Sequence, residues 1–176
     1  WDRETQVASR IQMIMAAGED NNFISFVWMT VTNIVGCMKR IGQRTSIKSL
    51  LEHVQSQETA EALCEKVLER YLIDLVPHFE TIIAERVRDS EAAAAKPTRG
   101  KTPAITSPRL VALISFFKSE LKSGDRPQEI TGLIAALEAN REWFGKMIIT
   151  LTPTLTKLSN GDLGALLSPN YEDIED

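Results

Sequence analysis

The chain has 176 residues, of which 43% are hydrophobic and 25% are charged. This length is sufficient for one hydrophobic core and makes a single domain the expectation. Twenty Lys and Arg residues against twenty-four Asp and Glu residues give a formal net charge of -4, which excludes both a disordered polyelectrolyte and a surface that is basic throughout. Any electrostatic binding of nucleic acid must therefore come from local groups of cations.

Apolar residues at helical spacing predict two amphipathic helices at the start of the chain, over residues 2–17 and from about Asp20 to Arg40. Gly18 is expected to separate them. Within the second, the uncharged stretch 21–38 is apolar over most of its circumference but contains several Asn, Ser and Thr residues. This composition favours a central buried helix over a membrane span.

The next segments also carry helical patterns with recognisable caps. Thr45 is expected to cap a short helix that ends at Val54, and Ser56 is expected to cap a long helix that reaches Val87. Pro77 lies inside the long pattern. It should kink or split that helix because proline lacks the backbone N–H and crowds the preceding turn.

Periodicity disappears over residues 90–106, which we interpret as a mobile linker within the domain. Ser107 and Pro108 then begin a helix, and a turn follows it at residues 123–125. The last long pattern predicts one helix over residues 127–158, weakened at Gly132 and bent at Pro153. A short helical turn is expected at residues 163–167.

No segment shows the alternation of a strand. We therefore predict that residues 1–176 form a single all-α, bundle-like domain of six to seven helices with no sheet, arranged as two hairpin-like groups joined by the 90–106 linker. Cys37 and Cys64 lie within helical apolar patterns, at a spacing that fits neither a disulfide framework nor a zinc site. Both are expected to be reduced core residues in a reducing compartment.

The sequence predicts no catalytic residue and no metal site. Gly100-Lys101-Thr102 matches the end of a phosphate-binding loop, but Ala95 stands where that loop needs its first glycine, and Pro103 stands where its helix should run. An enzyme domain that uses the Lys101 loop is the remaining catalytic alternative. His53 and His78 each stand without a second ligand at metal-binding spacing, as structural or exposed histidines do.

Two groups of cations are the candidate binding residues for nucleic acid or a partner. The first group lies in a stretch with no acidic residue between Asn21 and Leu51 and consists of Lys39, Arg40, Arg44 and Lys48. The second surrounds the predicted linker and consists of Lys96, Arg99, Lys101 and Arg109. The alternatives are cations that complement a helix C-terminus and a plain solvated linker.

The stretch 151–169, which ends in Leu166-Leu167-Ser168-Pro169 and precedes the acidic residues 170–176, resembles a segment of TraD-type conjugative coupling proteins. The resemblance is to the subfamily of integrative elements related to SXT and TOL. These proteins are DNA-pumping ATPases of type IV secretion. In this family an all-helical domain is inserted into a RecA-like nucleotide-binding domain, and the resemblance implies that this chain is such an insert.

The resemblance further implies a membrane-anchored, hexameric parent protein in the bacterial inner membrane, which uses ATP and Mg²⁺. Its helical domain faces the cytoplasm, is not inserted in the membrane, and delivers substrate to the secretion channel by contacting a relaxase, a relaxosome accessory protein or DNA. The family's phosphate loop and Walker B strand match no position here, so we expect no ATPase activity and no cofactor in this chain. The alternative is a helical protein–protein adaptor that does not bind DNA.

Overall fold

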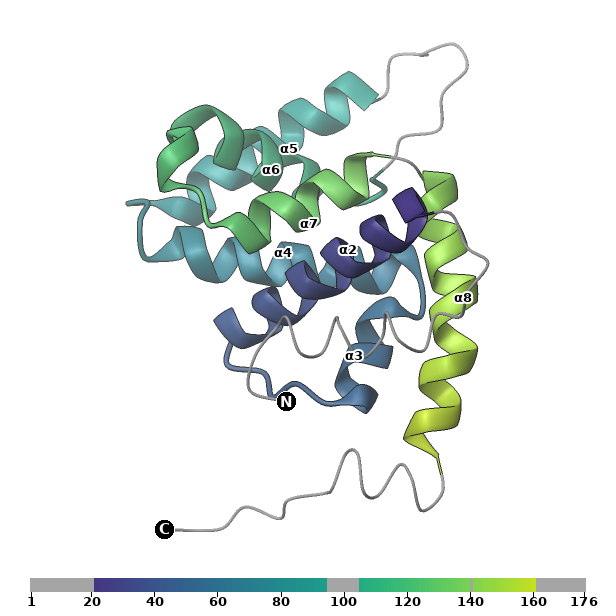
Figure 1. Cartoon of the computed structure of the whole chain (residues 1–176). Helices are drawn as coiled ribbons and strands as arrows, with labels where there is room; N and C mark the ends of the chain where they lie inside the picture. The colour runs from purple at the N-terminus through teal and green to yellow at the C-terminus, as the bar shows by residue number, and fades with distance from the viewer. Residues whose placement is uncertain (1–20, 95–104, 140, 161–176) are drawn as a thin grey trace, which may run out of the picture.

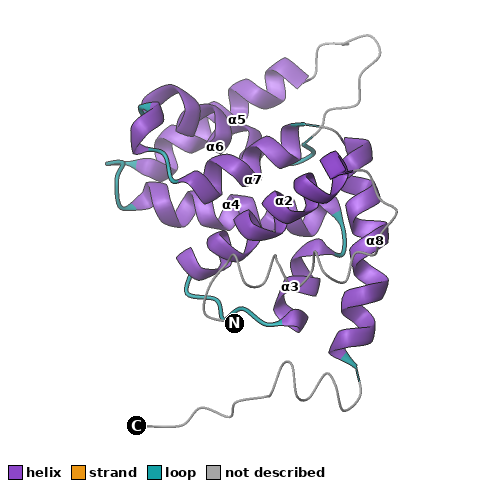
Figure 2. Ribbon diagram, viewed as in Figure 1, coloured by secondary structure: helices purple, strands orange, loops and turns teal. Residues whose placement is uncertain are grey.

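The computed structural model describes residues 21–94, 105–139 and 141–160, which form helices joined by short connections (Figures 1 and 2). No strand occurs in these ranges, which confirms the prediction of an all-α fold with six to seven helices. The elements in chain order are α2 (Asn21–Arg40), α3 (Ile47–Val54), α4 (Gln57–Ile73), α5 (Phe79–Ala94), α6 (Pro108–Glu120), the 3₁₀ turn η1 (Ser123–Asp125), α7 (Gln128–Glu138) and α8 (Arg141–Ser159).

Helix α2 packs on α7 and α4, which also pack on each other (Figure 1). Its buried side chains recur at helical spacing and include Phe23, Val27, Val31 and Ile34. Because many of its residues are β-branched, the helix depends on this packing more than on intrinsic propensity. The prediction of a buried helix is confirmed for this face, whereas Met29 on the other side is 56% exposed. No helix in the described part of the chain is long and apolar enough to cross a bilayer.

Glycines allow α2 and α7 to approach each other closely. A Cβ atom added to Gly36 would lie 2.8 Å from the Cβ atom of Glu129, and one added to Gly132 would overlap the side chain of Asn33. From its helix propensity alone, Gly132 is expected to be a weak point in a helix. The structure gives it a packing role, because only the absence of a side chain lets the two helices cross at this distance.

Serine caps fix the starts of three helices. Ser46 and Ser56 form capping boxes with Ser49 and Thr59, and the hydroxyl of Ser107 accepts a hydrogen bond from the N–H of Leu110. The prediction that Thr45 caps α3 is therefore wrong by one residue. The caps at Ser56 and Ser107 are confirmed.

Pro77 splits the long predicted helix of residues 56–87, as expected. Helix α4 ends at Ile73 and α5 begins at Phe79, so the proline lies in the connection. The residue after it, His78, has a φ angle of 58° and is exposed. Such a left-handed conformation is uncommon for a residue other than glycine, and it reverses the chain direction between α4 and α5.

Two other predicted boundaries are wrong. Helix α5 continues to Ala94, beyond the expected start of the linker at Ser90, because a run of alanines has high helix propensity. The predicted single helix of residues 127–158 is instead two helices. The chain leaves helical geometry at Ala139, whose ψ angle is -95°, so that α7 packs on α2 and α4 while α8 packs mainly on α3.

The two halves of the chain do not form separate hairpin-like groups. Helix α6 packs on both α4 and α5, and α7 packs on α2 and α4, so all of these helices share one hydrophobic core. Cys37 and Cys64 are buried free thiols in this core, as expected. The predicted segments 2–17 and 163–167, and residues 95–104 of the predicted linker, lie outside the described residues.

Candidate nucleic-acid and partner interface

The first cation group lies along the chain from the end of α2 to the start of α3, which the connection of residues 41–46 separates (Figure 1). Gly42 has a φ angle of 74°, which allows the chain to turn directly after α2, and its N–H donates to the carbonyl of Lys39 at 2.9 Å. We call the four residues Lys39, Arg40, Arg44 and Lys48 the basic patch. They are consecutive cations along the end of α2, the connection after it and the first turn of α3.

Within the basic patch, Arg40 also holds the fold together. Its Nε atom donates to Oε1 of Glu129 at 2.7 Å, and its guanidinium lies 5.6 Å from the ring centroid of Tyr71. Arg40 therefore links the end of α2 to α7 and α4. An anionic ligand would have to compete with Glu129 for this guanidinium.

The other cations of the patch differ in their exposure. Lys39 is half-buried, whereas Arg44 and Lys48 are exposed and form no ion pair with the described residues. No acidic residue lies between Asn21 and Leu51, and Glu52 follows Lys48 by one turn of α3 without forming an ion pair with it. Arg44 and Lys48 are thus the cations most open to an anionic partner.

The second cation group is only partly described. Lys96, Arg99 and Lys101 lie outside the described residues. Arg109 lies in the first turn of α6, where its Nε atom is 2.5 Å from Oε1 of Glu69 and its NH2 group is 3.3 Å from Glu80. The hydrogen bond that Arg109 donates to Glu69 raises the pKa of Arg109. This guanidinium joins α6 to α4 and α5.

A row of carboxylates on α4 anchors the chain where it enters α6. Oε2 of Glu61 accepts hydrogen bonds from the N–H and the hydroxyl of Thr106, at 3.2 and 2.8 Å. One helical turn further, Glu65 accepts a hydrogen bond from the hydroxyl of Ser107 at 2.7 Å, and Glu69 follows after another turn. Glu61 is only 3% exposed, whereas Thr106 is exposed, so the anchor lies where the protein interior meets the surface.

This anchor was missed in the sequence analysis. The signal was an acidic residue at every fourth position of a helix, which places Glu61, Glu65 and Glu69 on one face. The sequence alone did not indicate that this face meets the start of α6.

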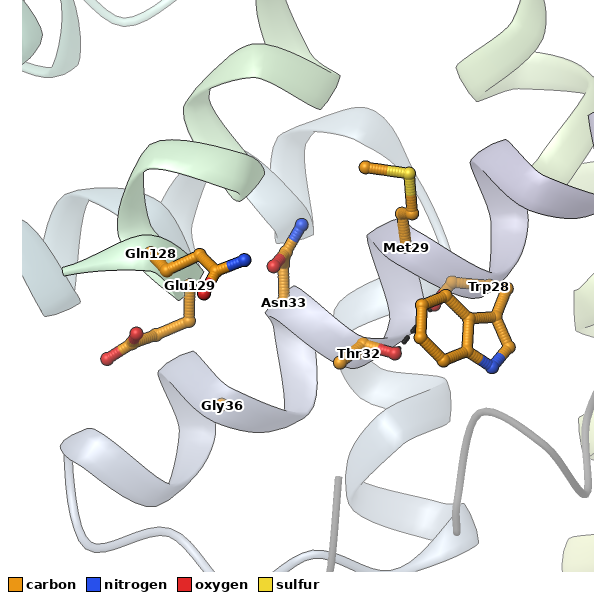
Figure 3. A pocket seen from close by; sticks show the side chains of 7 residues that line it. All are labelled: Trp28, Met29, Thr32, Asn33, Gly36, Gln128 and Glu129. Carbon is orange, nitrogen blue, oxygen red and sulfur yellow. Dashed lines mark hydrogen bonds between the residues drawn. The ribbon is translucent and has the colours of Figure 1, made fainter. Parts of the chain in front are cut away.

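A hollow of about 500 Å³ opens between α2 and α7, close to the Arg40–Glu129 ion pair (Figure 3). Met29 is 56% exposed at this site, and the indole of Trp28 lies at the same end. The amides of Asn33 and Gln128 face each other across the hollow in Figure 3. Its lining combines apolar and hydrogen-bonding groups: Trp28, Met29, Thr32, Asn33, Gly36, Gln128 and Glu129.

The hollow can hold apolar and amide groups of a partner, because it offers an aromatic ring, a thioether and two carboxamides side by side. The hydroxyl of Thr32 is already used, since it donates to the carbonyl of Trp28 at 2.8 Å. Sequence reasoning missed this site because its two walls come from segments about 100 residues apart.

The described residues contain no group of three side chains that could hold a metal ion. The ring of His53 is hydrogen-bonded through Nε2 to Oε1 of Gln43 at 2.9 Å, and burial lowers its pKa. Burial also raises the pKa of the Cys37 thiol to about 12 and raises that of Cys64. Both thiols are therefore protonated at neutral pH and poor nucleophiles.

Comparison with protein-family models, with curated proteins and with solved structures finds no match to this chain.

Proposed function

We propose that this chain is the cytoplasmic recognition domain of a TraD-type conjugative coupling protein, which contacts relaxosome components or DNA and delivers them to a type IV secretion channel. The observation that carries the binding role is the exposed pair Arg44 and Lys48, in the connection after α2 and the first turn of α3. The resemblance of residues 151–169 to coupling proteins supports the assignment to conjugation. An all-helical fold is also what this role requires.

On this proposal, phosphate groups bind Arg44 and Lys48, and the other cations contribute less. Arg40 shares its charge with Glu129, and Arg109 shares its charge with two carboxylates. ATP hydrolysis belongs to the RecA-like part of the parent protein, so the isolated chain binds without turning over nucleotide. We also propose Lys96, Arg99 and Lys101, which lie outside the described residues, as contacts for nucleic acid or a partner.

The test is a titration of labelled single-stranded DNA with the chain, followed by fluorescence anisotropy at several salt concentrations. Each phosphate neutralised on a single strand contributes about 0.7 to the slope of log K against log salt, so R44A/K48A should lower the slope by about 1.4. The matched control is R88A/K122A, which removes the same charge from exposed positions on α5 and before η1. An equal loss in both variants, or no salt-sensitive binding by the unmodified chain, would refute the DNA-binding role.

A protein–protein adaptor without DNA binding is the second candidate function, and the hollow between α2 and α7 favours it. A partner that fills the hollow would cover Met29 and Trp28, which lie at its rim. Replacing Met29 by serine should then weaken capture of a relaxase or accessory protein. Ile149→Ser is the control, since Ile149 is 75% exposed on α8, away from the hollow.

A further inference from the structure

The hollow between α2 and α7 contains two carboxamides whose hydrogen-bonding groups are unused. The amides of Asn33 and Gln128 face each other across it (Figure 3). Neither carboxamide forms a hydrogen bond with the described residues, and each combines N–H donors with a carbonyl acceptor. Each of the two walls therefore offers both a donor and an acceptor to a ligand.

The carboxamide of Asn33 is held in place by the helix crossing. It lies against α7, where a Cβ atom added to Gly132 would overlap it. The missing side chain of Gly132 therefore leaves the room that this amide occupies. A polar group that is already positioned loses less conformational entropy when a ligand binds.

Met29 and Trp28 form the apolar end of the hollow, one helical turn before Asn33 (Figure 3). Four residues of a helix span about 6 Å, since each rises about 1.5 Å. Two residues of an extended chain span about the same length. A peptide strand that places one apolar side chain against Met29 thus brings its adjoining main-chain amides to Asn33.

An extended main chain matches the two walls and their charge. The N–H and C=O groups of a strand lie along both of its edges, so a strand between α2 and α7 can meet both carboxamides. Within the described part of the chain, the charged lining residue is Glu129, whose carboxylate is paired with Arg40. Because this lining adds a carboxylate and no unpaired cation, it favours an uncharged segment over a strand of phosphates.

We propose that the hollow binds an extended segment of a protein partner through its main chain. Asn33 and Gln128 form the hydrogen bonds, and Met29 and Trp28 receive one apolar side chain. This inference rests on the protein partner named under the proposed function. Because main-chain amides are common to all sequences, the hollow selects an extended segment with an apolar residue and not a particular motif.

The test uses N-acetyl-leucine-N-methylamide, a probe with two amides and one apolar side chain. In an NMR titration it should shift the side-chain NH₂ signals of Asn33 and Gln128 with a Kd of about 1 mM, the affinity expected for about a dozen non-hydrogen atoms. N-acetyl-leucine methyl ester, which lacks one N–H, should bind about fivefold more weakly. The absence of a saturable shift, or equal binding of amide and ester, overturns the proposal.

Variants of the two walls test the same contacts from the protein side. Asn33→Ala and Gln128→Ala should each weaken probe binding about fivefold. Gly132→Ala keeps both carboxamides but displaces that of Asn33, so it should weaken binding as much as Asn33→Ala does. The matched control is Gln55→Ala, because Gln55 is an exposed carboxamide that does not line the hollow. Unchanged binding in both wall variants, or an equal loss in the control, overturns the proposal.

The outcomes separate this inference from the proposed function. Probe binding by a chain that fails the DNA titration refutes the DNA-binding role and supports the site. If Met29→Ser weakens capture of a relaxase or accessory protein while Asn33→Ala and Gln128→Ala do not, the adaptor role stands and the main-chain contact is refuted. A deoxynucleoside that shifts the same signals with a lower Kd than the peptide probe also overturns the proposal, because the hollow would then be a site for a base.

Discussion

Replacing Gly36 by alanine tests the close crossing of α2 and α7, which forms one wall of the hollow and positions the Arg40–Glu129 ion pair. The new Cβ atom would lie 2.8 Å from the Cβ atom of Glu129. That atom is fixed by the backbone of α7 and cannot rotate away, so the helices must separate. Gly145→Ala is the matched control, because a Cβ atom at that position in α8 meets nothing within 4 Å.

The magnitude follows from two opposing effects. Alanine is favoured over glycine inside a helix by about 1 kcal/mol, a gain that both substitutions share. Overpacking a close contact costs about 1–3 kcal/mol, and only Gly36→Ala has this cost. We therefore expect Gly145→Ala to stabilise the protein by about 0.5–1 kcal/mol. The free energy of unfolding of Gly36→Ala should lie about 1–3 kcal/mol below that of Gly145→Ala.

The assay is urea unfolding followed by far-UV circular dichroism. The E129Q background should leave the cost of Gly36→Ala unchanged, because glutamine keeps the Cβ atom. Glu129→Gly should remove most of the cost, and a double-mutant cycle isolates this coupling. Equal stabilisation by Gly36→Ala and Gly145→Ala would refute the close crossing.

Two other predictions concern buried polar groups. Glu61→Ala should lower the free energy of unfolding by about 1–3 kcal/mol, because the N–H and hydroxyl of Thr106 lose their acceptor. Hydrogen exchange of the Thr106 N–H should become faster. An unchanged exchange rate would contradict the anchoring role of Glu61. Burial lowers the pKa of His53 below its ordinary value of 6.5, so its contribution to stability is complete above pH 6.5 and is lost as the pH falls through the folded-state pKa. His53→Gln should therefore remove part of the fall in stability between about pH 7.5 and pH 5, and identical pH profiles of the two proteins would contradict a buried neutral imidazole.

Local signals in the sequence were sufficient to predict most of the described helices. The caps at Ser56 and Ser107 and the interruption at Pro77 are encoded within a few residues, so their structural consequences could be predicted directly. The break at Ala139 could not, because the apolar stripe continues across it. It arises from the different packing partners of α7 and α8, which is information that no local window contains.

The candidate site also combines features that the local sequence predicts with contacts that it does not predict. The sequence places Arg40, Arg44 and Lys48 in one group, and the structure places them on the end of α2, the connection and the start of α3. The sequence does not show that Arg40 contacts Glu129 or that Arg109 contacts Glu69, because these partners are 89 and 40 residues apart in the chain. Cations that look equivalent in sequence therefore differ in how much charge they can offer a ligand.

This difference constrains how the proposed recognition domain could work. Two exposed cations account for a salt slope of only about 1.4 on a single strand, whereas proteins that bind DNA tightly make about 6–10 phosphate contacts. A single copy with Arg44 and Lys48 as its main contacts would bind DNA weakly and without base preference. Tight, selective binding then requires either several copies acting on one strand, which raises avidity without new contacts, or a protein partner. The hollow between α2 and α7 is lined by Glu129, the ion-pair partner of Arg40, and offers a protein partner apolar and amide contacts, so in the proposed mechanism selectivity comes from the hollow and the patch supplies attraction.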